Sequence, residues 1–192
     1  MIIRSLKTLI ATLACALILA NSSVGARLWS SPLAVAAEMS REYLIKAAFL
    51  YNFAKFTEWP AAAFASADSP LTICVLGDDP FGAALDAIDG KEIKGRTVSV
   101  RRLADTAVAE ACHVIFISIS EETRLTDILD ILRGRPVLTV ADMPEFARTG
   151  GIINLKTNEE ERIRFDINIG KAQQAGLRMS SKLLSLAEAT YN

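Results

Sequence analysis

The sequence has a single histidine, three cysteines and no surplus of basic residues. One histidine excludes metal sites built on several histidines and acid–base pairs that need two of them. With 21 Lys and Arg against 22 Asp and Glu, the net charge is −1, so composition gives no indication of nucleic-acid binding. A chain that is 51% apolar and 22% charged is not intrinsically disordered, and 192 residues suffice for one domain with a sizeable core.

The first 36 residues have the features of a signal peptide. Arg4 and Lys7 precede an apolar run of thirteen residues (8–20), which is shorter than the roughly twenty needed to span a bilayer. Small-residue cleavage patterns end at Ala26 and at Ala36, and the second has the A-x-A form. We therefore expect export to the periplasm, with residues 37–192 as a single mature domain. The alternative is an uncleaved N-terminal anchor.

Two cysteines would remain after cleavage, because Cys15 lies in the apolar run. An isolated pair in an oxidising compartment is typical of one disulfide, here between Cys74 and Cys112. The bond would close a loop of 39 residues. The alternative is two buried free thiols.

Hydrophobic periodicity predicts an alternation of strands and helices along the first two thirds of the mature chain. Apolar runs that suit strands buried on both faces alternate with residues spaced three and four apart, which are typical of helices. The expected elements are a helix at 40–55 with Ser40 as its N-cap, a strand at 71–77, a short helix at 81–88, strands at 98–100 and 114–118, a helix at 121–132 and a strand at 137–140.

The last third of the chain has a different pattern. Two apolar segments, 152–156 and 163–167, flank a polar turn and predict a β-hairpin whose second strand alternates strictly. Asn168 is placed to cap a final helix through Ala187. The predicted fold is therefore α/β: a mostly parallel central sheet flanked by helices, with an added C-terminal β-hairpin and a final helix.

The segment Gly77–Gly82 follows the first buried strand, where α/β folds bind phosphate. It lacks the Lys and Ser/Thr of a P-loop, and its aspartates would repel an anion. We interpret Asp79 as a helix cap with Pro80 at the first helical position. A hard-cation site formed by Asp78, Asp79 and Asp142 is the less favoured alternative.

Nucleophilic catalysis is not indicated either. Cys112 and His113 are neighbours on a strand, so their side chains point to opposite faces, and a disulfide would remove the thiolate. No G-x-S-x-G segment occurs. We expect no catalytic, metal or cofactor-binding residues, and therefore no enzyme.

The predicted hairpin is the first candidate for a partner-binding surface. Neighbouring strand residues face opposite ways, so one of Ile152 and Ile153 is expected to face outward as an anchor. Arg164 and Asp166 would form a polar rim around it, unless helices cover both faces of the hairpin.

The first helix offers a second candidate surface, since it is apolar on more than one side. Phe49 and Phe53 lie apart from the other apolar residues of this helix. They would contact a partner, or be buried under the loop 60–70.

Taken together, these segments resemble the YfiR family of exported bacterial proteins over about residues 41–187. The resemblance rests on the segments 43–60 (YLIKAAFLYNFAKFTEWP), 73–82 (ICVLGDDPFG), 95–96 (GR), 112–118 (CHVIFIS), 150–155 (GGIINL), 164–168 (RFDIN) and 175–186 (AGLRMSSKLLSL). Their order is more specific than any one of them.

The resemblance implies a non-enzymatic periplasmic repressor that needs no cofactor. It would hold a membrane-bound diguanylate cyclase of the YfiN type inactive, thereby controlling cyclic di-GMP and biofilm formation. An outer-membrane lipoprotein of the YfiB type could sequester it, and it could form a homodimer. Cys74 and Cys112 match a disulfide position of the family, but its second cysteine pair is absent from 145–151. The alternative function is a periplasmic small-ligand sensor that uses the crevice at the carboxyl ends of the strands.

The exported protein is expected to begin near Ala37, because the charged, apolar and A-x-A segments occur in the order of a signal peptide. N-terminal sequencing of the protein from the periplasmic fraction measures this directly. An intact chain that starts at Met1 and stays in the cytoplasm would contradict it.

Overall fold

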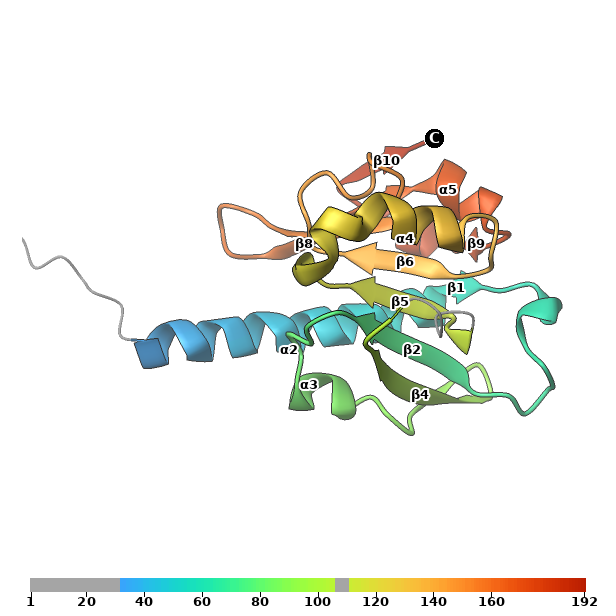
Figure 1. The fold of residues 1–192 in the computed structure, drawn as a ribbon, viewed down its shortest axis with the longest axis horizontal. Coiled ribbons are helices and arrows are strands. Elements are labelled where there is room, and N and C mark those ends of the chain that lie inside the picture. The colour runs from blue at the N-terminus through green and yellow to red at the C-terminus, as the bar shows by residue number, and fades with distance from the viewer. Residues whose placement is uncertain (1–31, 106–110) are drawn as a thin grey trace, which may run out of the picture. The chain divides into compact units, whose positions relative to one another are not determined.

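A mostly parallel sheet organises the chain (Figure 1). The structure, a computed structural model, describes residues 32–105 and 111–192, with side chains from residue 41 onward. Its sheet strands are β2 (Leu71–Leu76), β3 (Glu92–Ile93), β4 (Arg96–Leu103), β5 (Val114–Ile117), β6 (Leu138–Ala141), β7 (Ile153–Thr157), β8 (Ile163–Asn168) and β10 (Ala189–Tyr191). Most of the predicted signal peptide lies outside the described residues, so its prediction stays open.

The strand order is β10-β8-β7-β6-β5-β2-β4-β3. The five strands from β4 to β7 run parallel, β8 pairs antiparallel with β7, and β10 adds parallel to β8. Every residue of β2, β5 and β6 is buried, which explains why their sequences read as continuous apolar runs. The predicted α/β class and its mostly parallel sheet are confirmed.

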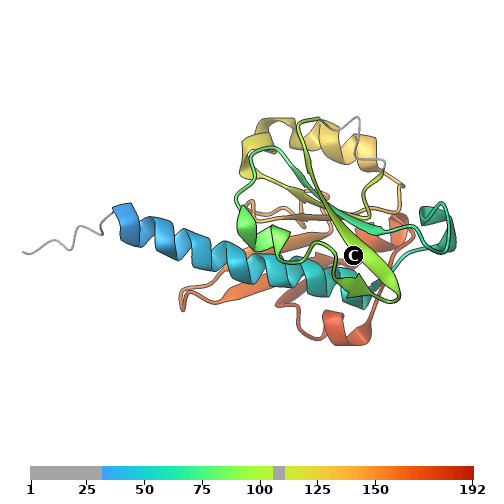
Figure 2. The ribbon, with the colours of Figure 1, turned by 90° about the horizontal axis from the view of Figure 1, so that it is seen from below.

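Helices cover both faces of this sheet. They are α2 (Pro32–Phe56), α3 (Ala83–Asp86), α4 (Leu125–Leu132), α5 (Ile169–Gln174) and α6 (Ser181–Leu184), with 3₁₀ turns η1 (Ala61–Ala63) and η3 (Ile119–Arg124). Figure 2 shows α2 and α4 on opposite sides of the strands. These two helices pack over different apolar clusters. Leu50 and Phe53 of α2 belong to one cluster, and Ile128 and Leu132 of α4 belong to the other.

Three predicted helices have different boundaries, and the shortest of them, expected over 81–88, is α3 at Ala83–Asp86. The first begins at Pro32 rather than Ser40, so Ser40 is an interior helical residue and not the N-cap. The helix expected over 121–132 consists of the 3₁₀ turn η3 followed by α4. Apolar spacing marks the buried face of a helix but does not distinguish 3₁₀ from α geometry over so short a stretch.

The prediction of a single long C-terminal helix is wrong. Asn168 does cap a helix, since its Oδ1 accepts the backbone N–H of Lys171 at 2.8 Å. That helix, α5, ends at Gln174 because Gly176 adopts a left-handed φ of 70°. After it come β9 (Arg178–Met179), which pairs with β1 (Thr57–Glu58), and the short helix α6. Beyond Ala187, β10 pairs with β8.

The predicted hairpin is confirmed, with β7 and β8 in register from Ile153 opposite Ile167 to Thr157 opposite Ile163. Its odd-numbered side chains Ile153, Leu155 and Phe165 join the cluster under α2.

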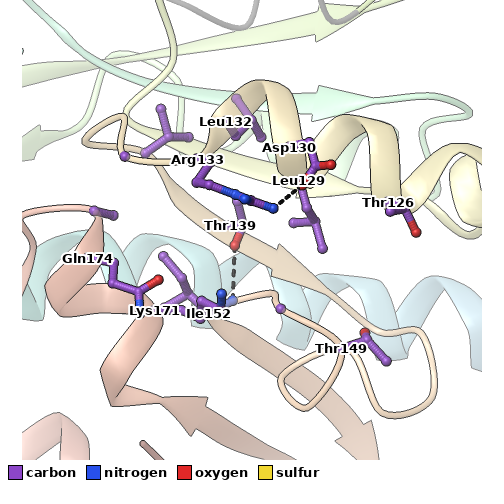
Figure 3. A pocket seen from close by; sticks show the side chains of 14 residues that line it. Thr126, Leu129, Asp130, Leu132, Arg133, Thr139, Thr149, Ile152, Lys171 and Gln174 are labelled. Atoms are coloured by element: carbon purple, nitrogen blue, oxygen red, sulfur yellow. Dashed lines mark hydrogen bonds and ion pairs between the residues drawn. The ribbon is translucent and has the colours of Figure 1, made fainter.

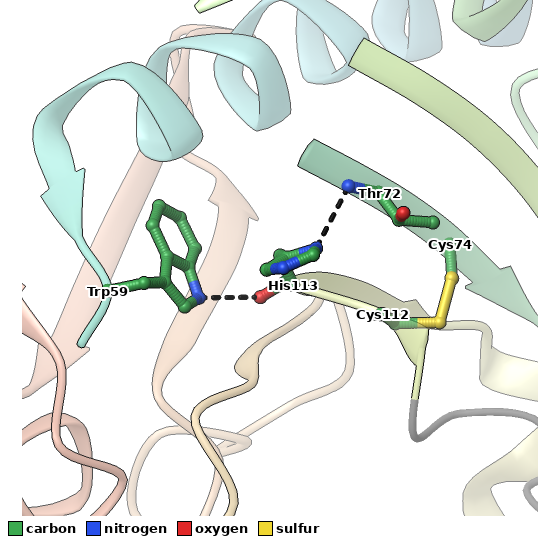
Figure 4. Close-up of a disulfide and its surroundings, with 5 residues drawn as sticks. All are labelled: Trp59, Thr72, Cys74, Cys112 and His113. Carbon is green, nitrogen blue, oxygen red and sulfur yellow. Dashed lines mark hydrogen bonds between the residues drawn. A yellow bond between two sulfur atoms is a disulfide. The ribbon is translucent and has the colours of Figure 1, made fainter. Parts of the chain in front are cut away.

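The predicted disulfide joins β2 to the segment before β5. Cys74 and Cys112 are bonded across a sequence separation of 38 residues, with their Cα atoms 6.0 Å apart. The pairing follows from topology, because β2 and β5 are neighbouring parallel strands. Both sulfurs lie in the cluster under α4 (Figure 4).

Replacing both cysteines by alanine is expected to lower the free energy of unfolding by a few kcal/mol. The loop length sets an upper limit of about 4 kcal/mol, because the bond restricts the unfolded chain. Guanidinium unfolding of the oxidised protein, the reduced protein and the Cys74→Ala/Cys112→Ala variant measures the effect. Equal transition midpoints for all three would contradict it.

Candidate functional site

A buried ammonium group, that of Lys46, is the centre of a polar cluster where α2 crosses the carboxyl edge of the sheet. The side chain is only 4% exposed. Its Nζ lies 2.5 Å from Asp142 Oδ2 and 2.7 Å from Glu42 Oε1. Tyr43 donates a hydrogen bond to the same Asp142 oxygen at 2.8 Å. Asp142 is thereby neutralised by a structural partner and joins β6 to α2.

Tyr43 serves as a donor in this cluster. Burial, followed by the charge of Asp142, raises the pKa of Tyr43 above its ordinary value of 10.0, so its hydroxyl stays protonated. The ring packs edge-on against Phe81 at a centroid distance of 5.2 Å. Tyr43 therefore ties the loop after β2 to the helix.

The aspartates after β2 have local roles. Asp79 Oδ1 accepts the backbone N–H of Phe81 at 2.8 Å, and its Oδ2 accepts from Arg102 Nε at 2.6 Å. Asp79 thus caps a turn, but α3 begins only at Ala83, so Pro80 is not its first residue. Within the described parts of the chain, no three His, Cys, Asp or Glu side chains are placed to hold a metal ion.

The crevice expected between the carboxyl ends of β2 and β5 is filled by the chain itself. Ser120 Oγ accepts the backbone N–H of Asp78 at 2.9 Å. A Cβ atom added to Gly77 would lie 2.4 Å from the same oxygen and 2.8 Å from Glu121 Cγ. A small-ligand site at this point of the sheet would require Ser120 and Glu121 to move.

At the amino edge of the sheet, His113 holds the loop that follows α2 (Figure 4). Its Nδ1 accepts the backbone N–H of Thr72 at 3.0 Å, so the ring proton sits on Nε2, which donates to the carbonyl of Ala63 at 3.1 Å. Trp59 Nε1 donates to the His113 carbonyl at 3.2 Å. Both ring nitrogens therefore have structural partners.

Phe64 lies between two planar groups in the same region. Its ring stacks on the His113 imidazole with centroids 4.3 Å apart, and the Arg96 guanidinium lies 3.7 Å from its centroid. Burial, and secondarily the charge of Arg96, lowers the pKa of His113, while the hydrogen bond to Ala63 opposes this. With Cys112 in the disulfide, these neighbours form no thiolate–imidazole pair.

The hairpin residues predicted to bind a partner are mostly internal. Ile152 is 4% exposed and Ile153 is fully buried, so the prediction that one of them faces solvent is wrong. Ile152 precedes β7 rather than lying in it, and both isoleucines belong to the apolar cluster under α2. The backbone N–H of Ile152 donates to Thr139 Oγ1 at 3.0 Å.

Asp166 is not a rim residue but the point where the C-terminal strand is attached. It is buried, accepts from Lys156 Nζ at 2.9 Å and accepts the backbone N–H of Ala189 at 3.1 Å. Burial alone would lower the pKa of Lys156. The hydrogen bonds and charges of Asp166 and Glu188 have the larger effect together, so the pKa of Lys156 is raised. Arg164, its neighbour in β8, is exposed.

The aromatic pair of α2 is covered by the hairpin. Phe53 is fully buried and Phe49 partly buried. Their ring centroids lie 5.0 and 5.8 Å from that of Phe165 in β8. The second apolar side of the helix is thus covered by β8, and not by the loop 60–70.

A different face of α2 remains in solvent. Leu44 and Ile45 are 56% and 41% exposed, although both are large and apolar. With four neighbours on the same helix they form a strip of exposed residues that spans about 100° of the helix circumference, at 100° per residue. We call this strip the α2 stripe, and its members are Arg41, Leu44, Ile45, Ala48, Asn52 and Lys55. The sequence analysis did not identify this stripe, although its members are spaced three, four and seven residues apart, which places them on one side of a helix.

The comparison with known families agrees with this architecture. Residues 43–188 match the sequence profile of the family described as YfiR/HmsC-like. The chain belongs to the YfiR/HmsC-like family. Proteins of this family are in general periplasmic and regulatory, are not catalysts, and interact with partner proteins.

Two solved structures are similar to part of this YfiR/HmsC-like chain. One is the ABC domain from Streptococcus pneumoniae in complex with L-Trp, with 12% identity, a TM-score of 0.46, and coverage of 62% of this chain and 55% of that one. The other is a conserved domain protein from Vibrio cholerae, with 14% identity, the same TM-score, and coverage of 62% and 54%. The chain spans about half the length of each.

No helix in the described part of this YfiR/HmsC-like chain is both long and apolar enough to cross a membrane.

Acidification below pH 6.5 is expected to destabilise this YfiR/HmsC-like domain through His113. Its folded pKa is lower than the ordinary value of 6.5, so the unfolded state binds more protons at moderately acidic pH. The stabilisation is complete above 6.5 and is lost as the pH falls toward the folded pKa. Urea unfolding from neutral pH down to pH 5.5 measures the trend.

The control is His113→Gln, which removes the titrating group. Above pH 5.5 the carboxylates, whose ordinary pKa values are near 4, contribute little to the trend. The same pH dependence in wild type and variant would exclude His113 as its source.

Proposed function

We propose that this chain is a periplasmic repressor that binds a membrane-bound diguanylate cyclase of the YfiN type, and so controls cyclic di-GMP and biofilm formation. Its export would depend on the signal peptide predicted over residues 1–36, with 37–192 as the mature domain. Membership of a periplasmic regulatory family supports this function. The α2 stripe is the structural observation that carries it.

The stripe has the composition of a protein-binding surface. Leu44 and Ile45 place large apolar side chains on its two edges, and Ala48, which is four and three residues further along the helix, lies between them. Contiguous exposed apolar groups rimmed by polar residues mark interaction sites, and a few central anchors dominate the binding energy. The small side chain of Ala48, next along the stripe, allows a partner to approach the helix closely.

The charges of the stripe favour a partner over a second copy. Arg41 and Lys55 lie at its two ends, and neither has an ion pair among the described residues. If two copies paired along this stripe, parallel or antiparallel, cations would face cations. A cyclase surface with apolar side chains between carboxylates would instead complement both ends.

Two residues of the earlier predictions remain accessible. Phe49 borders the stripe one turn beyond Ile45 and is partly buried, so it can extend the apolar contact. Arg164 is exposed on the hairpin and is a candidate for a further polar contact. An outer-membrane lipoprotein of the YfiB type is the proposed antagonist that would sequester the repressor.

Leu44→Asp and Ile45→Asp are each expected to weaken capture of the cyclase's periplasmic domain at least tenfold, about 1.4 kcal/mol. The thermal melt should change little, because both side chains are exposed. Calorimetric titration with the purified cyclase domain measures binding, and cyclic di-GMP in cells should rise with either variant. The matched control is Ile131→Asp on α4, where an isoleucine is 45% exposed on another surface.

The possible outcomes separate two failures. If the wild-type protein does not bind the cyclase domain, the proposed function is wrong. If it binds and both stripe variants bind equally well, the function stands and the surface lies elsewhere.

A further inference from the structure

A cavity of about 190 Å³ lies between α4 and α5, on a surface that the α2 stripe does not include. Figure 3 shows Leu129, Asp130 and Arg133 reaching it from α4, with Gln174 of α5 on the other side and Thr139 of β6 between them. It opens where the apolar cluster under α4 meets the one under α2. Nothing in the proposed function uses this cavity.

The walls of the cavity combine apolar side chains with polar ones such as Thr126, Thr149 and Gln174, and they hold one buried hydroxyl group. Leu129, Leu132, Val137 and Ile152 supply carbon surface. Thr139 is 4% exposed, and its Oγ1 accepts the backbone N–H of Ile152 at 3.0 Å. A threonine hydroxyl that accepts one bond still has its own hydrogen to donate. Among the described residues it donates that hydrogen to none, so it is available to a ligand in the cavity.

The charges around the cavity sum to one positive charge. Arg133 is paired with Asp130, so these two cancel. Lys171 also lines the cavity, and it has no ion pair within the described residues. Its flexible four-carbon stem can place the ammonium group over the opening. One uncompensated cation beside carbon surface suits a single negative charge attached to an apolar group.

We propose that this cavity binds a small organic monocarboxylate with a short aliphatic body. The carboxylate would accept from the Lys171 ammonium group and the Thr139 hydroxyl, and the carbon chain would lie on Leu129, Leu132 and Val137. The size fits, because an apolar cavity of about 150 Å³ accommodates benzene. At about 190 Å³ the cavity therefore takes a ligand of roughly six to eight heavy atoms.

Other ligand classes fit less well. Inorganic phosphate would leave the carbon surface of Leu129, Leu132 and Val137 unused. A neutral amide of the same shape would fill the walls but would forgo the charge of Lys171. The combination of one cation, one buried donor and the carbon surface of Leu129, Leu132 and Val137 favours a carboxylate with a hydrocarbon part.

Calorimetric titration of the mature domain with isovalerate tests the proposal, with isovaleramide and inorganic phosphate as comparison ligands. Saturable binding of isovalerate is expected, with the amide and phosphate at least tenfold weaker. Lys171→Met should weaken isovalerate at least tenfold. The matched control Lys182→Met removes an exposed lysine whose ammonium group lies over the Phe56 ring, and should bind as wild type does.

A second pair of variants separates the ligand contact from folding. Thr139→Ser keeps the hydroxyl group and should retain binding, whereas Thr139→Val should lose it. Because Thr139 also holds the Ile152 N–H, thermal melts must show that both variants are folded.

Three results would overturn the proposal. One is no binding of isovalerate to the wild-type domain. Another is equal binding of the amide or of phosphate. The third is unchanged affinity in Lys171→Met.

Discussion

The ion pair between Lys46 and Asp142 determines how α2 lies on the sheet. Removing one partner from a buried ion pair costs about 3–5 kcal/mol, because the other charge is left without compensation. Lys46 must therefore face β6, which fixes the rotation of the helix. Leu50 and Phe53 then pack on the strands, and Leu44 and Ile45 point to solvent. The α2 stripe is thus a consequence of a buried charge on the same helix.

Sequence reasoning succeeded where a local pattern had one structural solution. Strands buried on both faces, such as β2 and β5, read as unbroken apolar runs, and their neighbouring positions brought Cys74 and Cys112 together. It failed at the C-terminus, where the helical spacing after Asn168 continued past Gly176. There the left-handed glycine and the pairing of β9 and β10 with distant strands override local propensity. Such pairings depend on tertiary structure that no short window contains.

The candidate site was harder to predict than the fold. Ile152 and Ile153 are apolar neighbours at the start of the hairpin, but the sequence does not show that both are covered. Likewise, the apolar sides of α2 could be counted, but which side Phe165 covers depends on where β8 lies. A surface site consists of side chains that are not buried in the core, and so it can be assigned only after every packing partner is known. The α2 stripe could be assigned only because the structure shows which side chains of α2 are buried.

Several buried polar groups among the described residues hold elements of the fold together. His113 uses both ring nitrogens on backbone groups, Asp142 joins β6 to α2, and Asp166 attaches β10. A group that stabilises the fold through both of its hydrogen-bonding sites has no free site with which to act on a substrate, and perturbed pKa values arise in structural networks as well as in active sites. The capacity to act on other molecules therefore falls to groups that have a hydrogen-bonding site or an apolar surface that the fold does not use. In the described chain these include the solvent-facing side chains of α2 and the lysine and threonine beside the cavity between α4 and α5. A fold with its charges arranged in this way is suited to presenting a rigid surface, which a regulatory protein that acts by binding a partner requires.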